Sequence, residues 1–215
     1  MINYEFTQNW FSHKDLEKFI LPDINPNNEL HILEIGSFEG KSTVWWAENL
    51  LVNSKSTITC LDPWISYIQN SKSYSEYDKD TAGYDISKGE VTMFGVEDRF
   101  LANIKKSKKS NQINIRKGFS FDVLPKLNTE NKKFDIIFID GNHTSPFVIT
   151  DAVFSWYLLN RGGIMIFDDY LWGNPVAKGK PTLSPKLAID SFINIFSDYI
   201  EIIYSAHRKA IKRII

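Results

Sequence analysis

Short apolar runs alternate with helical patterns along most of this 215-residue chain, and this alternation restricts the fold more than any other feature. The expected strands are 30–36, 56–62, 113–118, 134–140, 163–169, 199–205 and 209–215. Helical patterns lie near 14–20, 41–52, 96–107, 119–125, 146–159 and 185–197. A regular succession of strand and helix predicts a mostly parallel sheet with helices on both faces.

The last two expected strands are separated only by residues 206–208, so they must pair antiparallel. The predicted fold class is therefore α/β, a doubly wound, mostly parallel seven-stranded sheet that ends in an antiparallel hairpin. The length suits a single domain over 1–215. Residues 1–29 are expected to form an N-terminal arm or helix. Residues 65–95 lack a clear period, and we interpret them as an insertion that borders the substrate site or as a surface loop.

Composition excludes several classes of protein. The formal net charge is −1, so nucleic acid and anionic membranes are not expected partners. No apolar run approaches the roughly 20 residues of a membrane span, and the first residues do not resemble a secretory signal. The single cysteine, Cys60, excludes an intrachain disulfide and a cysteine metal cluster, and it is expected to be a buried thiol. These absences favour a cytoplasmic protein, with homo-oligomerisation left open.

A glycine turn, "LEIGSFEGKST" at 33–43, follows the first strong strand and opens a helix. Gly36 and Gly40 allow a tight turn and close approach to a ligand, and the free N–H groups at the helix start favour an anion. The stretch differs from the G-x-G-x-x-G dinucleotide fingerprint, because Ser37 and Phe38 stand in place of the second glycine. Such a turn is also needed structurally in any α/β protein.

The second strand ends at Asp62, where a doubly wound sheet places an acid that binds the hydroxyls of a ribose. Asp62 could instead cap the turn at Pro63. Its spacing from the glycine turn is close to that of a βαβ unit, and the two features together favour a nucleoside ligand.

Two further buried strands end in carboxylates, at Asp140 and at the pair Asp168 and Asp169. The carboxyl ends of parallel strands line one crevice, so these acids should meet there and raise one another's pKa. A set of hard oxygen ligands suits Mg²⁺ or a similar divalent cation. The alternatives are turn capping, a metal-free site with the same carboxylates, or contact of one acid with the positive end of a cofactor.

The glycine turn, Asp62 and the terminal hairpin together resemble class I S-adenosylmethionine-dependent methyltransferases. Within that family, "LEIGSFEGKST" and "GFSFDVLPKL" at 118–127 are similar to the catechol O-methyltransferase-like branch. "DGNH" at 140–143, followed by an aspartate-ended strand, resembles the bacterial group with macrolide-sugar O-methyltransferases. The resemblance covers residues 30–169; the arm and the insertion match nothing in the family.

The resemblance implies an S-adenosylmethionine-dependent O-methyltransferase that acts on a small-molecule hydroxyl of a sugar, phenol or polyketide-like scaffold. It implies that the cofactor meets a set of residues around the glycine turn and the following strands: Glu34, Gly36, Ser37, Phe38, Gly40, Ser42, Asp62, Pro63, Gly118, Ser120 and Asp140. The ribose would lie on Asp62 and the adenine near Ser120. The metal ligands would be Asp140, Asp168 and Asp169.

His143 stands three residues after Asp140, where the catechol branch has a lysine that removes the hydroxyl proton. Histidine titrates near neutral pH and can serve as the base, with Asp140 as its catalytic partner; alternatively it only orients Asp140 or a substrate oxygen. Two rival classes are an NAD(P)-dependent oxidoreductase, whose third glycine is missing, and an inactive nucleoside-binding module. Binding of S-adenosylmethionine rather than NAD would separate them.

Overall fold

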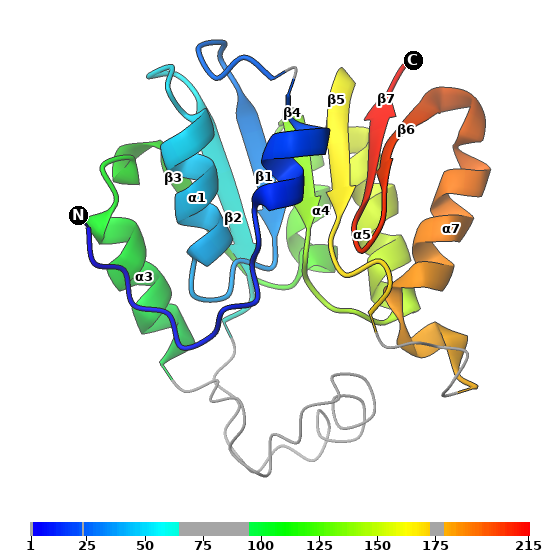
Figure 1. Ribbon diagram of the computed structural model, residues 1–215, viewed down its shortest axis with the longest axis horizontal. Coiled ribbons are helices and arrows are strands. Elements are labelled where there is room, and N and C mark those ends of the chain that lie inside the picture. The colour runs from blue at the N-terminus through cyan, green and yellow to red at the C-terminus, as the bar shows by residue number, and fades with distance from the viewer. Residues whose placement is uncertain (1, 23, 65–94, 173–178) are drawn as a thin grey trace.

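The computed structural model describes residues 2–22, 24–64, 95–172 and 179–215 (Figure 1). Within them lies one seven-stranded sheet with the order β3-β2-β1-β4-β5-β7-β6. The strands are β1 (His31–Ile35), β2 (Thr57–Asp62), β3 (Ile113–Lys117), β4 (Phe134–Ile139), β5 (Leu159–Phe167), β6 (Ile200–Ser205) and β7 (Lys209–Arg213). The first five pair parallel, and β7 pairs antiparallel with both β5 and β6. The predicted fold class is confirmed.

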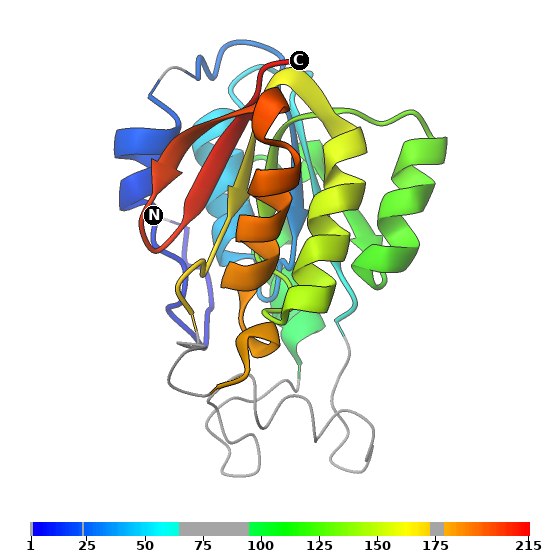
Figure 2. The same cartoon turned by 90° about the vertical axis from the view of Figure 1, so that its right-hand side faces the viewer.

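Helices cover both faces of the sheet (Figure 2). One face carries the π-helix η1 (Leu16–Ile20), α1 (Lys41–Leu50) and α3 (Val96–Lys106), and the other carries α4 (Ser120–Thr129), α5 (Ser145–Leu158) and α7 (Pro185–Ile195). Short 3-10 turns, η3 (Ser110–Gln112), η4 (Pro181–Leu183) and η5 (Ser197–Tyr199), join the larger elements.

Side chains of the central strands alternate between two separate hydrophobic cores, one on each face of the sheet. In β4, Ile136 and Phe138 pack under α1 and η1, whereas Ile137 and Ile139 pack under α5 and α4. Both sets are buried because a parallel sheet with helices on each face leaves no solvent side. The unbroken apolar run of β4 in the sequence therefore reflects its central place.

Two element boundaries differ by more than two residues from the sequence-based expectation. Strand β5 begins at Leu159, directly after α5, and not at 163, because its first residues already pair with Phe134 before a register shift. Helix α4 continues beyond Pro125 to Thr129. Proline removes one N–H donor and crowds the preceding turn, but the buried Leu124 and Leu127 hold the next turn against the core.

Three backbone hydrogen bonds gather the strand ends at one edge of the sheet. Gly36 N–H donates to the carbonyl of Leu61 at 2.8 Å, and Asp140 N–H donates to that of Ile35 at 2.8 Å. Asp168 N–H donates in the same way to the carbonyl of Ile139 at 3.0 Å. The loops after β1, β2, β4 and β5 therefore lie side by side.

Other expectations concern single segments. Cys60 is fully buried, as predicted. The proposed insertion at 65–95 lies outside the described residues except for Gly95, which precedes α3. Across the described ranges, the helices all fall short of the length and apolarity that crossing a bilayer requires.

Candidate functional site

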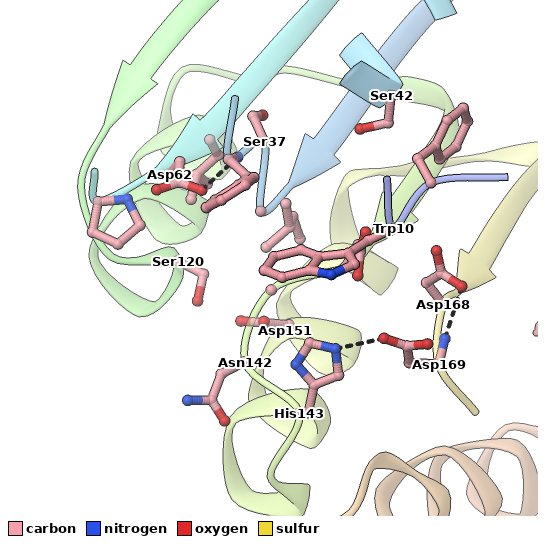
Figure 3. A pocket seen from close by; sticks show the side chains of 18 of the residues that line it. Trp10, Ser37, Ser42, Asp62, Ser120, Asn142, His143, Asp151, Asp168 and Asp169 are labelled. Carbon is pink, nitrogen blue, oxygen red and sulfur yellow. Dashed lines mark hydrogen bonds and ion pairs between the residues drawn. The ribbon is translucent and has the colours of Figure 1, made fainter. Parts of the chain in front are cut away.

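A cavity of about 660 Å³ opens at the carboxyl edge of the sheet (Figure 3). Eight of the residues predicted to meet a cofactor line it: Gly36, Ser37, Phe38, Ser42, Asp62, Pro63, Ser120 and Asp140. The predicted catalytic and metal-binding residues His143, Asp168 and Asp169 line the same cavity. Residues that the sequence placed at or just after the ends of five different strands thus share one space.

Gly36 is the tightest point of the cavity floor. Its φ of +89° lies in the left-handed region, and a Cβ built there would lie 2.0 Å from the carbonyl oxygen of Asp140. No side chain fits between these two loops, so glycine is required both for conformation and for space. The close approach of the β1 and β4 loops is what brings Asp140 beside the glycine turn.

Glu34, Gly40 and Gly118 are predicted cofactor residues that lie outside the cavity lining. Glu34 is fully buried and accepts hydrogen bonds from the hydroxyls of Ser37, at 2.7 Å, and Thr43. Burial raises the pKa of Glu34 despite these hydrogen bonds. Gly40 and Gly118 both have positive φ, and Gly40 packs on Phe100. These three residues shape the turns behind the cavity wall.

Asp62 supports the glycine turn and also faces the cavity. One carboxylate oxygen accepts the N–H of Phe38 at 3.0 Å, and the other accepts the N–H of Trp64 at 2.7 Å. Burial raises the pKa of Asp62, and these backbone donors oppose that shift. A carboxylate has about four acceptor positions, so Asp62 keeps lone pairs for a ligand.

Asp140, His143 and Asp169 form a compact polar group. One ligand atom from each lies within 4.8 Å of the others, which is the arrangement that a bound cation needs. His143 Nε2 lies 2.7 Å from Asp169 Oδ2, and the imidazole ring packs against Trp172 with centroids 4.9 Å apart. Asp169 has a φ of +52°, a conformation in which aspartate is among the more tolerant residues.

Asp168 is paired with Arg208, in the turn between β6 and β7, and its Oδ1 also accepts the N–H of Asp169 at 2.8 Å. Arg208 Nη2 donates to Asp168 Oδ2 at 2.9 Å, and Nε lies 2.8 Å from Oδ1 as an ion-pair contact without hydrogen-bond geometry. Arg208 also donates to Asp15 and to the carbonyl of Ser12. The structure therefore gives Asp168 a different partner from Asp140 and Asp169.

The acidic side chains titrate differently because their surroundings differ. Burial, followed by the charges of Asp168 and Asp169, raises the pKa of Asp140 well above its usual value. Burial also raises the pKa of Asp168, although Arg208 opposes it. For Asp169, burial alone would raise the pKa, but the hydrogen bond from His143 and nearby positive charges outweigh this effect and lower the pKa. Asp140 is thus the carboxylate with the strongest need for a cation.

The N-terminal arm is a wall of the cavity that the sequence did not predict. Gln8, Asn9, Trp10 and Phe11 line it, and Trp10 stacks on Phe38 with centroids 5.0 Å apart. The arm is fixed where Thr7 donates to the buried Glu39 through its N–H and its hydroxyl. The Thr7–Glu39 contacts join residues 32 positions apart, so no local pattern reveals them.

Asp151 and Arg208 are further residues that sequence reasoning missed. Asp151 lies within the apolar helix α5 yet lines the cavity, and a carboxylate in an apolar helix face is the one signal that could have singled it out. Arg208 is read from the sequence only as part of a hairpin turn. Its burial follows from the packing of the arm against the hairpin.

Comparisons with known proteins agree on the type of domain. Residues 33–170, more than half of the chain, match the family model described as "Methyltransferase domain". A putative O-methyltransferase from Klebsiella pneumoniae has a similar structure, with a TM-score of 0.66 and 15% identity, covering 97% of this chain and 84% of that one. The resemblance found in the sequence is confirmed at the level of this family.

Two other proteins are similar over shorter shares of their length. MycE methyltransferase of the mycinamycin pathway, solved with Mg, S-adenosylhomocysteine (SAH) and mycinamycin VI, has a TM-score of 0.57 and 16% identity. That match covers 94% of this chain and 48% of MycE. Uncharacterized protein R132 of Acanthamoeba polyphaga mimivirus is 30% identical over 89 residues, which is 36% of this chain and 40% of the viral protein.

Proposed function

The chain belongs to the methyltransferase-domain family, and on that premise we propose that it transfers a methyl group from S-adenosylmethionine to a hydroxyl of a small-molecule acceptor. The observation that carries this proposal is the single cavity that joins Asp62 to His143. A nucleoside-binding acid and a proton-accepting imidazole face one space, as methyl transfer from a nucleoside donor to a hydroxyl requires.

The donor would lie over the glycine turn. Asp62 would accept hydrogen bonds from the ribose hydroxyls, and Ser37, Ser42 and the N–H groups at the start of α1 would hold the carboxylate of the methionine part. Gly36, Phe38 and Pro63 would form the surface beneath it. Bound there, S-adenosylmethionine supplies an activated methyl group whose bond to sulfur breaks as the acceptor oxygen attacks.

His143 would take the proton of the acceptor hydroxyl. The hydrogen bond of 2.7 Å to Asp169 occupies Nε2, which leaves Nδ1 as the nitrogen that can accept a proton. Asp169 would hold the ring in place and stabilise the imidazolium that forms. In this role Asp169 acts through His143, as a positioning residue for the base.

Asp140 and Asp169 would also be the main ligands of a divalent cation. Mg²⁺ prefers oxygen ligands, so the two carboxylates are better ligands for it than the imidazole of His143, which stays available as the base. A cation there would lower the pKa of the acceptor hydroxyl and offset the charge on Asp140. Asp168, originally predicted as a third ligand, is held by Arg208 and would instead fix the position of the β5 loop.

The acceptor would bind between the arm and the loop after β5. Trp10, Phe147 and Trp172 line the cavity, with Trp172 packed against His143, and aromatic walls suit a ring-shaped or apolar acceptor. The mycinamycin complex of MycE supports a bulky natural-product or sugar acceptor as one class to test.

Calorimetric titration tests the proposal most directly. We expect SAH, the demethylated donor, to bind and NAD to leave no heat signal. Asp62→Ala should weaken SAH binding by at least about tenfold, the equivalent of about 1.4 kcal/mol. Asp135→Ala is the matched control, since Asp135 also accepts two hydrogen bonds but lies at the amino end of β4. Failure of the unmodified protein to bind SAH would rule out the proposed function.

A further inference from the structure

Asp151 presents an incompletely bonded carboxylate to the cavity. It projects from α5, lies between Ser120 and His143 in Figure 3, and is only 2% exposed. Its Oδ1 atom is buried and has no hydrogen-bond partner among the described residues. Burying a carboxylate without full hydrogen bonding is costly, so its presence in the cavity wall calls for a ligand.

Other buried carboxylates near the sheet edge each hold protein groups as well. Glu34 holds the hydroxyls of Ser37 and Thr43 through Oε2, and its unpartnered Oε1 belongs to a residue outside the cavity lining. Asp62 holds two backbone N–H groups. Asp168 is held by Arg208. Asp151 contacts the Ser120 hydroxyl, and its buried Oδ1 has no partner among the described residues, so this acid in the cavity lining has acceptor capacity to spare.

Its position assigns it to the nucleoside end of the cavity. Ser120 and Asp62 lie on one side of the site in Figure 3, and Asp168 and Asp169 lie on the other. Asp151 contacts Ser120 and so belongs to the first side. Phe119 and Phe121, which stack on each other with centroids 5.1 Å apart, line the same part of the cavity and offer a flat apolar surface.

We propose that the Asp151 carboxylate recognises the adenine of the methyl donor by accepting a hydrogen bond from its exocyclic amino group. This inference rests on the proposed function, because it names the base that the donor site selects. Ser120 is the second polar contact of the base. An ionised carboxylate can only accept hydrogen bonds, so it attracts an amino group and repels a carbonyl oxygen at the same position.

The electrostatics of the site agree with this assignment. Burial raises the pKa of Asp151 to about 7, and the Ser120 hydrogen bond offsets only part of that effect. An N–H donor from a ligand would stabilise the ionised form of Asp151 and supply the hydrogen bond that Oδ1 lacks. Hypoxanthine, which carries a carbonyl in place of the amino group, places an acceptor against an acceptor.

The test compares SAH with S-inosylhomocysteine, in which a carbonyl oxygen replaces the amino group of the adenine. We expect the unmodified protein to bind SAH roughly 10- to 100-fold more tightly, the range of one hydrogen bond to a charged group. Asp151→Asn keeps the shape of the side chain and can turn its amide N–H to the carbonyl. This variant should therefore lose most of the preference, with weaker SAH binding and unchanged or tighter binding of the inosine analogue.

Two controls separate ligand recognition from a structural role. Asp135→Asn removes a part-buried carboxylate remote from the cavity and should leave both affinities unchanged. A thermal unfolding curve shows whether Asp151→Asn is folded. The inference is overturned if Asp151→Asn weakens both ligands equally, or if it leaves the preference for SAH intact. If the unmodified protein binds neither ligand, the proposed function fails first; if it binds both equally, only the adenine assignment fails.

Discussion

The guanidinium of Arg208 contacts both carboxylate oxygens of Asp168, with Nη2 2.9 Å from Oδ2 and Nε 2.8 Å from Oδ1. A third contact joins Arg208 to Asp15, next to the arm. Three carboxylates at one sheet edge need positive charge nearby, and this buried arginine supplies part of it from the far end of the chain. The ion pair also ties the arm, the β5 loop and the terminal hairpin together.

Removing Arg208 should destabilise the protein strongly. Arg208→Gln leaves Asp15 and Asp168 buried without their partner, which typically costs about 3–5 kcal/mol in the free energy of unfolding. Urea denaturation measures this loss. Combining Arg208→Gln with Asp168→Asn should cost less than the sum of the two single changes, because the second change removes an uncompensated charge. Strict additivity of the two would show that the pair does not couple.

Gly36→Ala should be among the most damaging single changes in the cavity wall. The new Cβ would lie 2.0 Å from the Asp140 carbonyl oxygen, at a φ of +89° that alanine disfavours. We expect a loss of more than about 4 kcal/mol, or failure to fold. Gly162→Ala is the matched control, with a φ of +78° and nothing within 4 Å of the added atom. It should cost only about 1–2 kcal/mol, and equal losses would refute the steric explanation.

His143→Gln should lower the turnover number while leaving SAH affinity nearly unchanged. The proposed base is lost, which typically costs about 10²- to 10⁴-fold in rate. Asp169→Asn should also slow methyl transfer. The carboxylate can only accept a hydrogen bond from His143 Nε2, whereas an amide can also donate one and so no longer fixes the proton on that nitrogen. Both variants are measured with an acceptor selected from a panel of phenols and sugars. An unaltered rate in His143→Gln would exclude His143 as the base.

Methyl transfer should require a divalent cation, and binding of that cation should depend on the carboxylates of Asp140 and Asp169. Chelation by EDTA should reduce methyl transfer, and added Mg²⁺ should restore it. Asp140→Asn and Asp169→Asn should weaken Mg²⁺ binding in a titration that monitors the metal alone. Asp168→Asn should change Mg²⁺ affinity far less, because Arg208 already holds Asp168. Full activity in EDTA would favour the metal-free alternative.

Asp151→Asn should stabilise the free protein at high pH. The pKa of Asp151 is raised from 3.8 to about 7 in the folded protein, so the folded state binds the proton more tightly than the unfolded state. Its contribution to stability is present at low pH and is lost as the pH rises through about 7. At pH 8 the variant should therefore unfold at a higher temperature than the unmodified protein. Its free energy of unfolding should be larger by on the order of a few kcal/mol.

The same comparison at pH 4 provides the control, because Asp151 is then protonated in the folded state and its replacement changes little. A variant that is less stable than the unmodified protein at pH 8 would contradict the pKa shift. A more stable variant with weaker SAH binding would mean that stability is given up at this position for ligand recognition.

Much of the site could be read from local sequence. The glycine turn, Asp62, Asp140 and the Asp168–Asp169 pair each end an apolar run, and a parallel sheet places all such ends at one edge. Strand succession and the short terminal turn were enough to predict the sheet with its antiparallel hairpin. These features depend on hydrophobic period and turn chemistry, which act over a few residues.

Other features were decided only when distant segments packed together. Arg208 meets Asp168 across 40 residues and Asp15 across 193, and no local pattern encodes such a pairing. The arm became a cavity wall through Trp10 on Phe38. Asp151 gained its raised pKa from burial beside Ser120. The sequence by itself determined which side chains reach the sheet edge. The tertiary structure decided their partners, because charge pairing and desolvation depend on distances in space and not along the chain.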